Sequence, residues 1–234
     1  MACDARFVML GGTLSRPWEI LVAAPVPSGE YPVRFRVDVA DAPLNRLTTA
    51  FRVFLAIPIL IVLRLVSGGS LTWSANGRSQ GLAAAGGLLF LAPLVMILFR
   101  QKYPRWWFDW NVALWRFGNR IAVYLFLLRD EYPATDDDQS VHLDVDYPDV
   151  PRDLNRWLPL VKWFLAIPHF IVLFFLWIAV FFGVVFAWFA ILFTGRYPPG
   201  LFDFVVGVLR WHNRVLGYAF VLSTDRYPPF SLDG

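Results

Sequence analysis

The residues best suited to chemistry form a polar set that occurs twice in the sequence. The first set is Asp109, Arg116, Asn119 and Arg120, and the second is Asp203, Arg210, Asn213 and Arg214. Spacings of 7, 10 and 11 residues place each set along one stripe of a helix, while tryptophan and phenylalanine cover much of the remaining surface. Such a helix is predicted to lie at a membrane interface, where its arginines could bind the phosphates of anionic lipid headgroups.

A second interpretation of these residues, which we prefer, is that ion pairs join the two sets. A charge near lipid needs a partner of opposite charge before it can serve a ligand. In that case Asp109 pairs with Arg210 or Arg214, and Asp203 pairs with Arg116 or Arg120.

No enzyme signature accompanies the polar sets. The three histidines lack zinc-ligand spacing, no glycine-rich phosphate loop precedes a helix, and no nucleophile stands beside a histidine and an acid. His169 lies in an apolar segment, but the repeat described below has Ile59 at its position, so we interpret it as a packed or interfacial histidine. The acidic run 136–138 is interpreted as a solvated linker and not as a metal cluster. We therefore expect no catalytic residues, no metal and no cofactor.

The composition points to lipid. Of the 234 residues, 57% are hydrophobic, 18% are aromatic and only 17% are charged, and the mean hydropathy is +0.51. These values exclude a disordered chain and favour a membrane protein. The arginines are spread along the sequence and not gathered into a basic module, so we expect no nucleic-acid partner. The lone cysteine, Cys3, cannot form an intrachain disulfide.

An internal repeat organises the chain. The runs 44–46 and 54–58 recur at an offset of 110, with 11 identities over the 20 positions from Leu44 to Leu63. From Tyr103 onward the offset is 94, so the first repeat carries 16 extra residues, which we place in the polar loop 67–81. Matched Asp, Asn and Arg positions are not explained by shared apolar composition, and they predict a tandem duplication.

Each repeat is predicted to contain a strand, an amphipathic segment, a transmembrane hairpin and an interfacial helix. The fold class is therefore a mainly α membrane protein with a small β element. The strands alternate apolar and polar residues over 33–39 and 141–146. They must lie outside the bilayer, paired with each other or with segments near 124–128 and 218–222.

The hairpins contain four predicted membrane spans. The first covers 51–99, and its second apolar segment, 82–99, is just long enough to cross. The second covers 158–193, which is too long for one span, so we place a turn near 176–178. Pro58 and Pro168 are predicted to kink or begin the spans. The alternative is one long tilted helix kinked at Pro168, with fewer full crossings.

These elements give the following predicted domain boundaries. Residues 1–30 form an N-terminal extension; 31–133 form the first repeat, with hairpin 51–99, loop 67–81 and interfacial helix 105–127; 134–140 form an acidic linker; 141–230 form the second repeat, with hairpin 158–193 and interfacial helix 199–221; and 231–234 form a tail.

Arginine and lysine gather before, between and after the two hairpins, whereas loop 67–81 holds only Arg78. By the positive-inside rule, both termini and the middle segment are predicted to be cytoplasmic. Both hairpins then enter from one side, and a pseudo-two-fold axis along the membrane normal is expected.

The second repeat resembles a known family. Its motifs are Leu154 to His169 (LNRWLPLVKWFLAIPH), Phe193 to Pro198 (FTGRYP), Leu201 to Phe204 (LFDF) and Thr224 to Phe230 (TDRYPPF). Together they are similar to the domain of unknown function 4389 family of bacterial, largely actinobacterial, membrane proteins. The resemblance covers about Tyr31 to Phe230 and departs in the first repeat at its extra loop and at Ile59. It implies a bacterial inner-membrane location and carries no catalytic residues.

Three functions compete on this basis. The preferred one is a multi-pass, non-enzymatic scaffold or accessory subunit at the inner membrane, bound to lipids and to a protein partner or a second copy. The alternative is a protein that binds or handles anionic lipid through its arginine stripe. A small transporter is disfavoured because the spans contain few polar residues to line a path.

Overall fold

The computed structural model describes residues 8–10, 13–15, 31–39, 43–66, 71–75, 78–82, 91–135, 137 and 139–233. Most of the predicted extension 1–30, including Cys3, and two members of the acidic run, Asp136 and Asp138, lie outside these residues. The chain divides into two compact units, Met1–Tyr31 and Pro32–Gly234. In the first unit, β1 (Val8–Leu10) and β2 (Thr13–Ser15) form an antiparallel pair.

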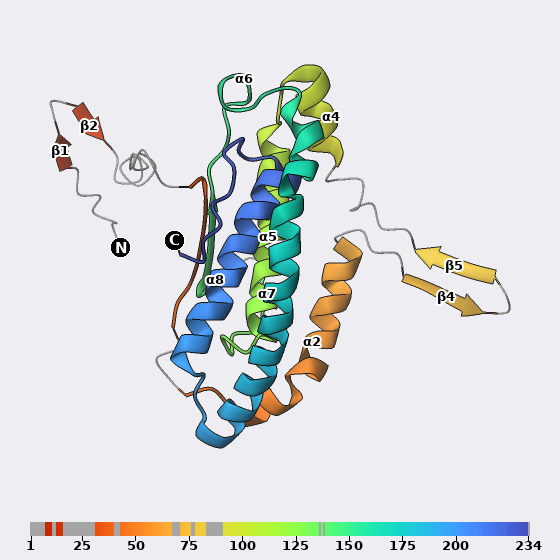
Figure 1. Cartoon of the computed structure of the whole chain (residues 1–234), viewed down its shortest axis with the longest axis vertical. Coiled ribbons are helices and arrows are strands. Elements are labelled where there is room, and N and C mark those ends of the chain that lie inside the picture. The colour runs from red at the N-terminus through yellow and green to blue at the C-terminus, as the bar shows by residue number, and fades with distance from the viewer. Residues whose placement is uncertain are drawn as a thin grey trace, which may run out of the picture. The chain divides into compact units, whose positions relative to one another are not determined.

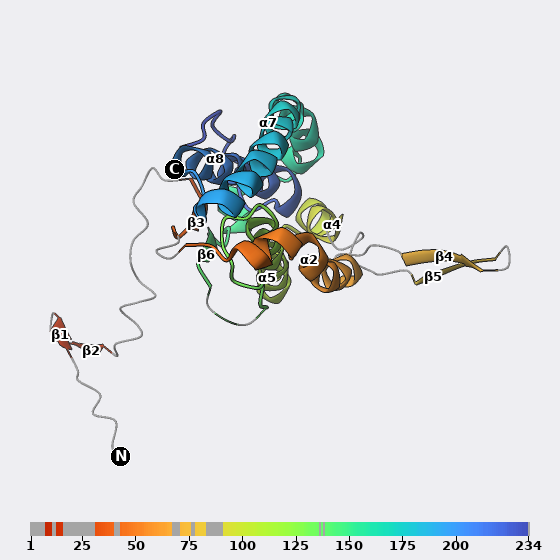
Figure 2. The ribbon, with the colours of Figure 1, turned by 90° about the horizontal axis from the view of Figure 1, so that it is seen from below.

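The second unit is mainly helical, with a small two-stranded sheet packed on its helices. Its helices are α2 (Arg46–Val66), α4 (Leu91–Arg100), α5 (Arg105–Leu125), α6 (Val150–Asp153), α7 (Leu158–Thr194) and α8 (Pro199–Leu216), and a π-helix, η1 (Gly217–Val221), continues α8. Figure 1 shows α2, α5, α7 and α8 running alongside one another. Seen from below in Figure 2, the sheet forms one layer, α5 and α8 form the next, and α2, α4 and α7 form the third.

The sheet consists of β3 (Val33–Val37) and β6 (Val141–Val145), which pair antiparallel with Phe35 opposite Leu143. The prediction that the two strands pair with each other is therefore confirmed. Alternation gives the sheet two different faces. The inner face is apolar and packs on α5 and α8, and the outer face carries Arg34, Arg36, Asp38, His142, Asp144 and Asp146.

Helix α7 is continuous over 37 residues, so the predicted hairpin with a turn near 176–178 is wrong. The residues there, Leu176, Trp177 and Ile178, include no turn former, and a turn would leave backbone groups unpaired among apolar side chains. Pro168 lies inside α7 and Pro58 inside α2, and neither ends its helix. Helix α7 ends at Thr194, and the next residue, Gly195, adopts a left-handed conformation with φ 76°.

The first repeat differs because its extra residues interrupt the equivalent helix. The sequence offsets align α2 with residues 156–176, of which 158–176 lie in α7, and α4 with residues 185–194 of α7. Within the predicted loop 67–81, β4 (Leu71–Ala75) and β5 (Arg78–Leu82) form a hairpin. Of the predicted span 82–99, the structure describes Leu82 at the end of β5 and residues 91–99 in α4, and residues 83–90 lie outside the described residues, so this span stays a prediction. Among the described residues, two helices, α2 and α7, are long and apolar enough to cross a membrane.

The polar sets lie on α5 and α8, close to the predicted ranges 105–127 and 199–221. Their position is internal and not peripheral, because each packs on a strand on one side and on α2 or α7 on the other. Most of α8 is buried, including Val205, Val208 and Leu209. The stripe pattern predicted the helices correctly, but it could not predict that another layer covers each of them.

Candidate functional site

The centre of the fold is a pair of asparagines from equivalent positions of the repeat. Asn119 on α5 and Asn213 on α8 are both buried and donate to each other, with Nδ2–Oδ1 distances of 2.9 and 2.8 Å. The indole N–H of Trp115 also donates to Oδ1 of Asn213 at 2.6 Å. A buried amide needs such partners, so this pair fixes the register of α5 against α8.

Arg116 and Arg210 hold the sheet by reciprocal hydrogen bonds. Nε of Arg116 donates to the carbonyl oxygen of Leu143 at 2.8 Å, and Nε of Arg210 donates to that of Phe35 at 3.2 Å. Each arginine thus binds the central residue of the strand that belongs to the other repeat. Arg116 also lies 4.0 Å from Asp144 on the outer face of the sheet.

Arg120 and Arg214 tether the segments that follow their helices. Nη1 of Arg120 donates to the carbonyl oxygen of Ala134 at 2.7 Å, in the predicted linker. The guanidinium of Arg214 donates to the carbonyl oxygens of Ser231 and Asp233, in the C-terminal tail. The expected ion pairs between the two sets are therefore replaced by bonds to backbone carbonyls, because the layered packing places strands, linker and tail beside these arginines.

The two aspartates of the polar sets do not join this network. Asp109 lies 4.0 Å from Arg105 of its own helix, and both side chains are exposed. Asp203 lines a surface pocket at the turn between α7 and α8. The structure thus brings Arg116, Asn119, Arg210 and Asn213 together around the sheet and separates the aspartates from them.

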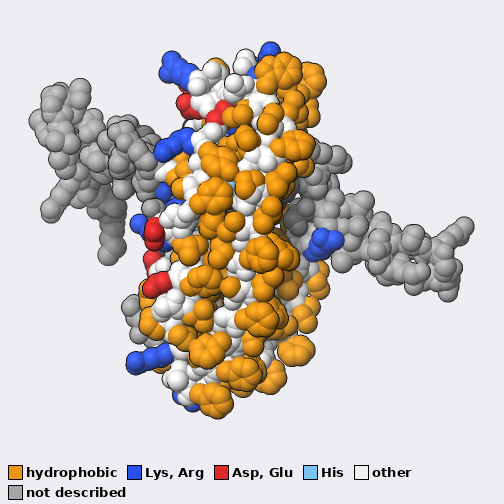
Figure 3. Space-filling view, viewed as in Figure 1, with side chains coloured by type: hydrophobic (Ala, Val, Ile, Leu, Met, Phe, Trp, Pro, Cys, Tyr) orange, Lys and Arg blue, Asp and Glu red, His pale blue; other side chains and the backbone are white. Residues whose placement is uncertain are grey.

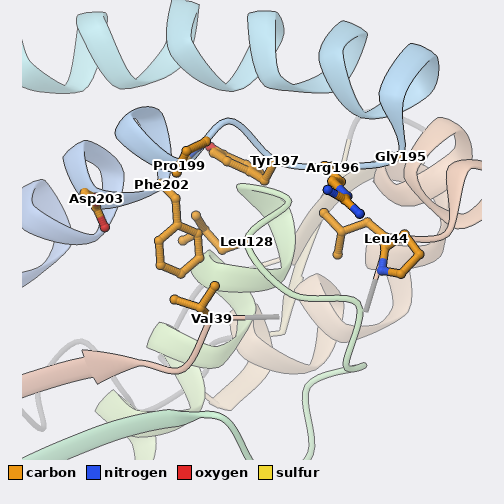
Figure 4. Close-up of a pocket in the computed structure, with 10 residues that line it drawn as sticks. Val39, Leu44, Leu128, Gly195, Arg196, Tyr197, Pro199, Phe202 and Asp203 are labelled. Atoms are coloured by element: carbon orange, nitrogen blue, oxygen red, sulfur yellow. The ribbon is translucent and has the colours of Figure 1, made fainter. Parts of the chain in front are cut away.

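That pocket has an equivalent in the other repeat. The first encloses about 380 Å³ and includes Val39, Arg196 and Tyr197. The second encloses about 590 Å³ and includes Lys102 and Tyr103 at the matching positions. In Figure 4, Phe202 lies near Leu128 and Val39, while Arg196 lies beside Leu44 and Asp203 stands apart on α8.

The two tyrosines of these pockets differ in hydrogen bonding. The hydroxyl of Tyr103 donates to the carbonyl oxygen of Val221 at 3.1 Å. The hydroxyl of Tyr197 is buried without a hydrogen-bond partner among the described residues. Burial raises the pKa of both phenols above the ordinary value, so both stay neutral donors. The exposed basic side chain beside each tyrosine, Lys102 or Arg196, suits an anionic group.

Two buried cations were not identified from the sequence as site residues. Arg52 pairs with Asp130 and donates to the carbonyl oxygens of Tyr124 and Arg129. Lys162, at the offset of 110 from Arg52, pairs with Asp225 at 2.7 Å. The signal was present, because each repeat has one cation at this position of an apolar segment.

The aspartates bound by these cations also cap the chain before α2 and α7. The backbone N–H of Asn45 donates to Asp130 at 2.7 Å, and that of Asn155 donates to Asp225 at 2.5 Å. Each aspartate therefore joins an apolar helix to the segment that follows α5 or η1.

The π-helix η1 explains a change of offset near the end of the repeat. Tyr124 matches Tyr218 at 94, but Asp130 matches Asp225 at 95, so one residue is added in between. A π-helical turn accommodates one added residue without ending the helix. Beyond it, Leu127 and Leu222 are both left-handed, with φ of 65° and 57°.

His169 is a packed residue, as the sequence interpretation held. Its ring is buried and stacks on Phe230 with centroids 4.0 Å apart, and Nδ1 accepts from the indole N–H of Trp211 at 3.1 Å. In the first repeat, the equivalent positions hold Ile59 and Phe117, which belong to one apolar cluster. A hydrogen-bonded pair and an apolar pair thus fill equivalent places.

One comparison with known proteins gives a match. The family model described as Domain of unknown function (DUF4389) matches residues 157–231. This part of the chain is therefore similar to that family. The matched segment comprises α7, α8, η1 and the chain as far as Ser231, one of the two tail residues that bind Arg214, so it contains most of the second repeat. No curated protein and no solved structure matches the chain.

Proposed function

We propose that the chain is a duplicated, membrane-bound, non-enzymatic scaffold. One face of the fold contacts lipid, and the charged face of the sheet meets an aqueous protein partner or a second copy of the chain. The observation that carries the proposal is the contrast between the α2–α7 layer, which is apolar and exposed, and the opposite β3–β6 layer, which is charged.

Large apolar side chains cover the outside of α2 and α7. Figure 3 shows them over these helices, with most of the visible charged groups along the left edge of the view and a few at the top and right. The exposed members include Phe51, Val53, Phe54, Ile57, Phe164, Ile171, Phe174, Phe175, Phe181, Phe182, Phe186 and Phe193. A continuous apolar face of this kind in water would be an association site, and lipid is its simplest partner.

Repeated geometry supports the duplication. The reciprocal bonds of Asn119 with Asn213 and the exchanged bonds of Arg116 and Arg210 join equivalent positions of the two repeats. The ion pairs of the sheet also join equivalent positions. At the offset of 108 between the strands, Arg34 corresponds to His142 and Asp38 to Asp146, so the pairs Arg34–Asp146 and His142–Asp38 are equivalent to each other. Independent segments would not produce three sets of matched contacts.

Two measurements test the proposed scaffold. The full chain should remain in the membrane fraction after carbonate washing, and a stoichiometric protein should copurify from gently solubilised membranes. Charge reversal of Arg36 to Glu, on the exposed outer face of the sheet, should release that protein while the chain stays folded. Release of the chain by carbonate, or copurification unaffected by changes on the sheet, contradicts the proposal.

Anionic-lipid binding is a second candidate, favoured by the basic rims of the two pockets. Arg196 and Lys102 are exposed beside Tyr197 and Tyr103. Mass spectrometry of the purified protein should then detect one anionic lipid class in excess of the bulk membrane. Replacing Arg196 and Lys102 by Gln should remove that lipid without unfolding, whereas the matched change of exposed Arg36 to Gln should not.

A further inference from the structure

We propose that α2 and α7 lie lengthwise in a single leaflet of the membrane, so that the protein sits on one side of the bilayer. The inference rests on the proposed membrane association and fixes its geometry. It replaces the multi-pass arrangement expected from the sequence. Three features of the fold support it.

The first feature is the length of the apolar surface of α7. At 1.5 Å per residue, its 37 residues extend about 55 Å, against a hydrocarbon core of about 30 Å. Exposed aromatic side chains continue from Trp157 at one end to Phe193 at the other. An upright helix would leave one apolar end in water, whereas a helix in the membrane plane keeps its whole outer face in lipid.

The second feature is the position of the charged sheet along the axis of α7. Arg210 bonds to Phe35, the central residue of β3. The next two residues of α8 contact the middle part of α7, because Trp211 bonds to His169 and His212 packs on Trp177 with ring centroids 5.3 Å apart. The centre of the sheet is therefore level with the central turns of α7.

This level decides where the charges of the sheet would lie. The pairs Arg34–Asp146 and His142–Asp38 are partly exposed, with N–O distances of 2.8 and 3.1 Å. If α7 crossed the bilayer about its midpoint, these groups would face hydrocarbon at its centre, where charged side chains are strongly unfavourable. With α7 in the membrane plane, the α5–α8 layer separates the sheet from lipid, and its outer face meets water.

The third feature is the relation between the repeats. Strands β3 and β6 are antiparallel, and α2 runs opposite to α7, since the start of α2 lies beside the end of α7 with Trp188 bonded to Thr49. The pseudo-two-fold axis is therefore perpendicular to the helices. Upright helices would place equivalent ends of the two repeats on opposite sides of the membrane, whereas flat helices place both on the same side.

The basic residues agree with the flat arrangement. Arg46 and Arg196 are exposed at one end of the α2–α7 layer, and Lys102 and Arg156 are exposed beyond α4 and before α7 at the other. Basic residues at both ends do not fit a crossing that follows the positive-inside rule. They do fit a layer whose two ends both meet the anionic headgroups of one leaflet.

Cysteine labelling of the full chain tests this geometry. In a Cys3→Ser background, four variants carry one cysteine each: Arg156→Cys before α7, Arg196→Cys after α7, Arg36→Cys on the sheet and Phe181→Cys on the outer face of α7. A membrane-impermeant maleimide is added to spheroplasts and to inside-out vesicles. The first three positions should label from one and the same side. Position 181 should be protected from both sides and should label after detergent is added.

The outcomes distinguish failure of the flat orientation of α7 from failure of the proposed membrane association. Labelling of positions 156 and 196 from opposite sides shows that α7 crosses, which overturns the flat arrangement and leaves membrane association intact. Labelling of position 181 in intact membranes, together with release of the chain by carbonate, overturns both. A nitroxide at position 181 gives a second reading: a depth about 5–10 Å below the headgroups is expected for a flat helix, and the bilayer centre contradicts it.

Discussion

Asn119 and Asn213 exchange two hydrogen bonds across the middle of the fold, at 2.9 and 2.8 Å. They lie 94 residues apart, at equivalent positions of the repeat, so each amide meets its own counterpart. Because the contact lies between α5 and α8, the pseudo-two-fold axis passes through it. A single polar pair thereby fixes how one repeat faces the other.

Replacing only one of the two asparagines should lower the free energy of unfolding by more than half of what replacing both lowers it. Asn213→Leu leaves the Asn119 amide and the Trp115 indole N–H without their partner, and we expect a loss of about 1–3 kcal/mol in the free energy of unfolding. The double change to Leu should cost less than the sum of the two single changes, because no buried amide remains unpaired. Urea unfolding in detergent micelles measures both, and additive losses would contradict a coupled pair.

Lys162 should be the most sensitive charged position in α7. Its side chain is fully buried against Asp225, so Lys162→Met leaves that carboxylate without its cation, and breaking a buried pair costs up to about 3–5 kcal/mol. Adding Asp225→Asn should recover part of this loss. The control is Lys102→Met, at an exposed lysine, which should change the midpoint of thermal unfolding very little. Equal effects at the two lysines would show that burial of Lys162 does not matter.

The two repeats supply their own matched test at His169. His169→Ile removes the acceptor of the Trp211 indole N–H, and we expect a loss of about 1–3 kcal/mol from the unpaired donor. Trp211→Phe should reduce that loss in the double variant, which then has the same residue types as Ile59 and Phe117 in the first repeat. Thermal unfolding of the two single variants and the double variant measures the coupling free energy between His169 and Trp211. A double variant less stable than His169→Ile would contradict equivalence.

His212 should make stability fall as the pH is lowered. Burial lowers its pKa from the ordinary 6.5 to about 4, so the folded state holds it neutral while the unfolded state gains a proton. Its contribution is complete above pH 6.5 and is lost as the pH falls from 6.5 towards 4. The slope is at most about 1.4 kcal/mol per pH unit. His212→Phe should flatten the profile of unfolding free energy in this interval, and an unchanged profile would contradict the assignment.

The sequence by itself predicted a tandem repeat, the two strands of the sheet and most of the main helices. Apolar runs and helical periodicity located α2, α5 and α8 and the apolar segment of α7, and alternation located β3 and β6, because these patterns follow directly from helix and strand geometry. Matched polar residues at offsets of 110 and 94 also identified Arg116, Asn119, Arg210 and Asn213 as a related set.

Only the tertiary structure decided what those residues touch. A stripe on a helix does not specify which layer covers it, so the arginines were expected to meet carboxylates and instead bind the carbonyl oxygens of strands and tail. The length of an apolar run likewise does not reveal a turn within it, and α7 is continuous where a hairpin was expected. Both choices depend on contacts between distant segments, since the free energy of satisfying a buried polar group is set by whichever chain lies beside it.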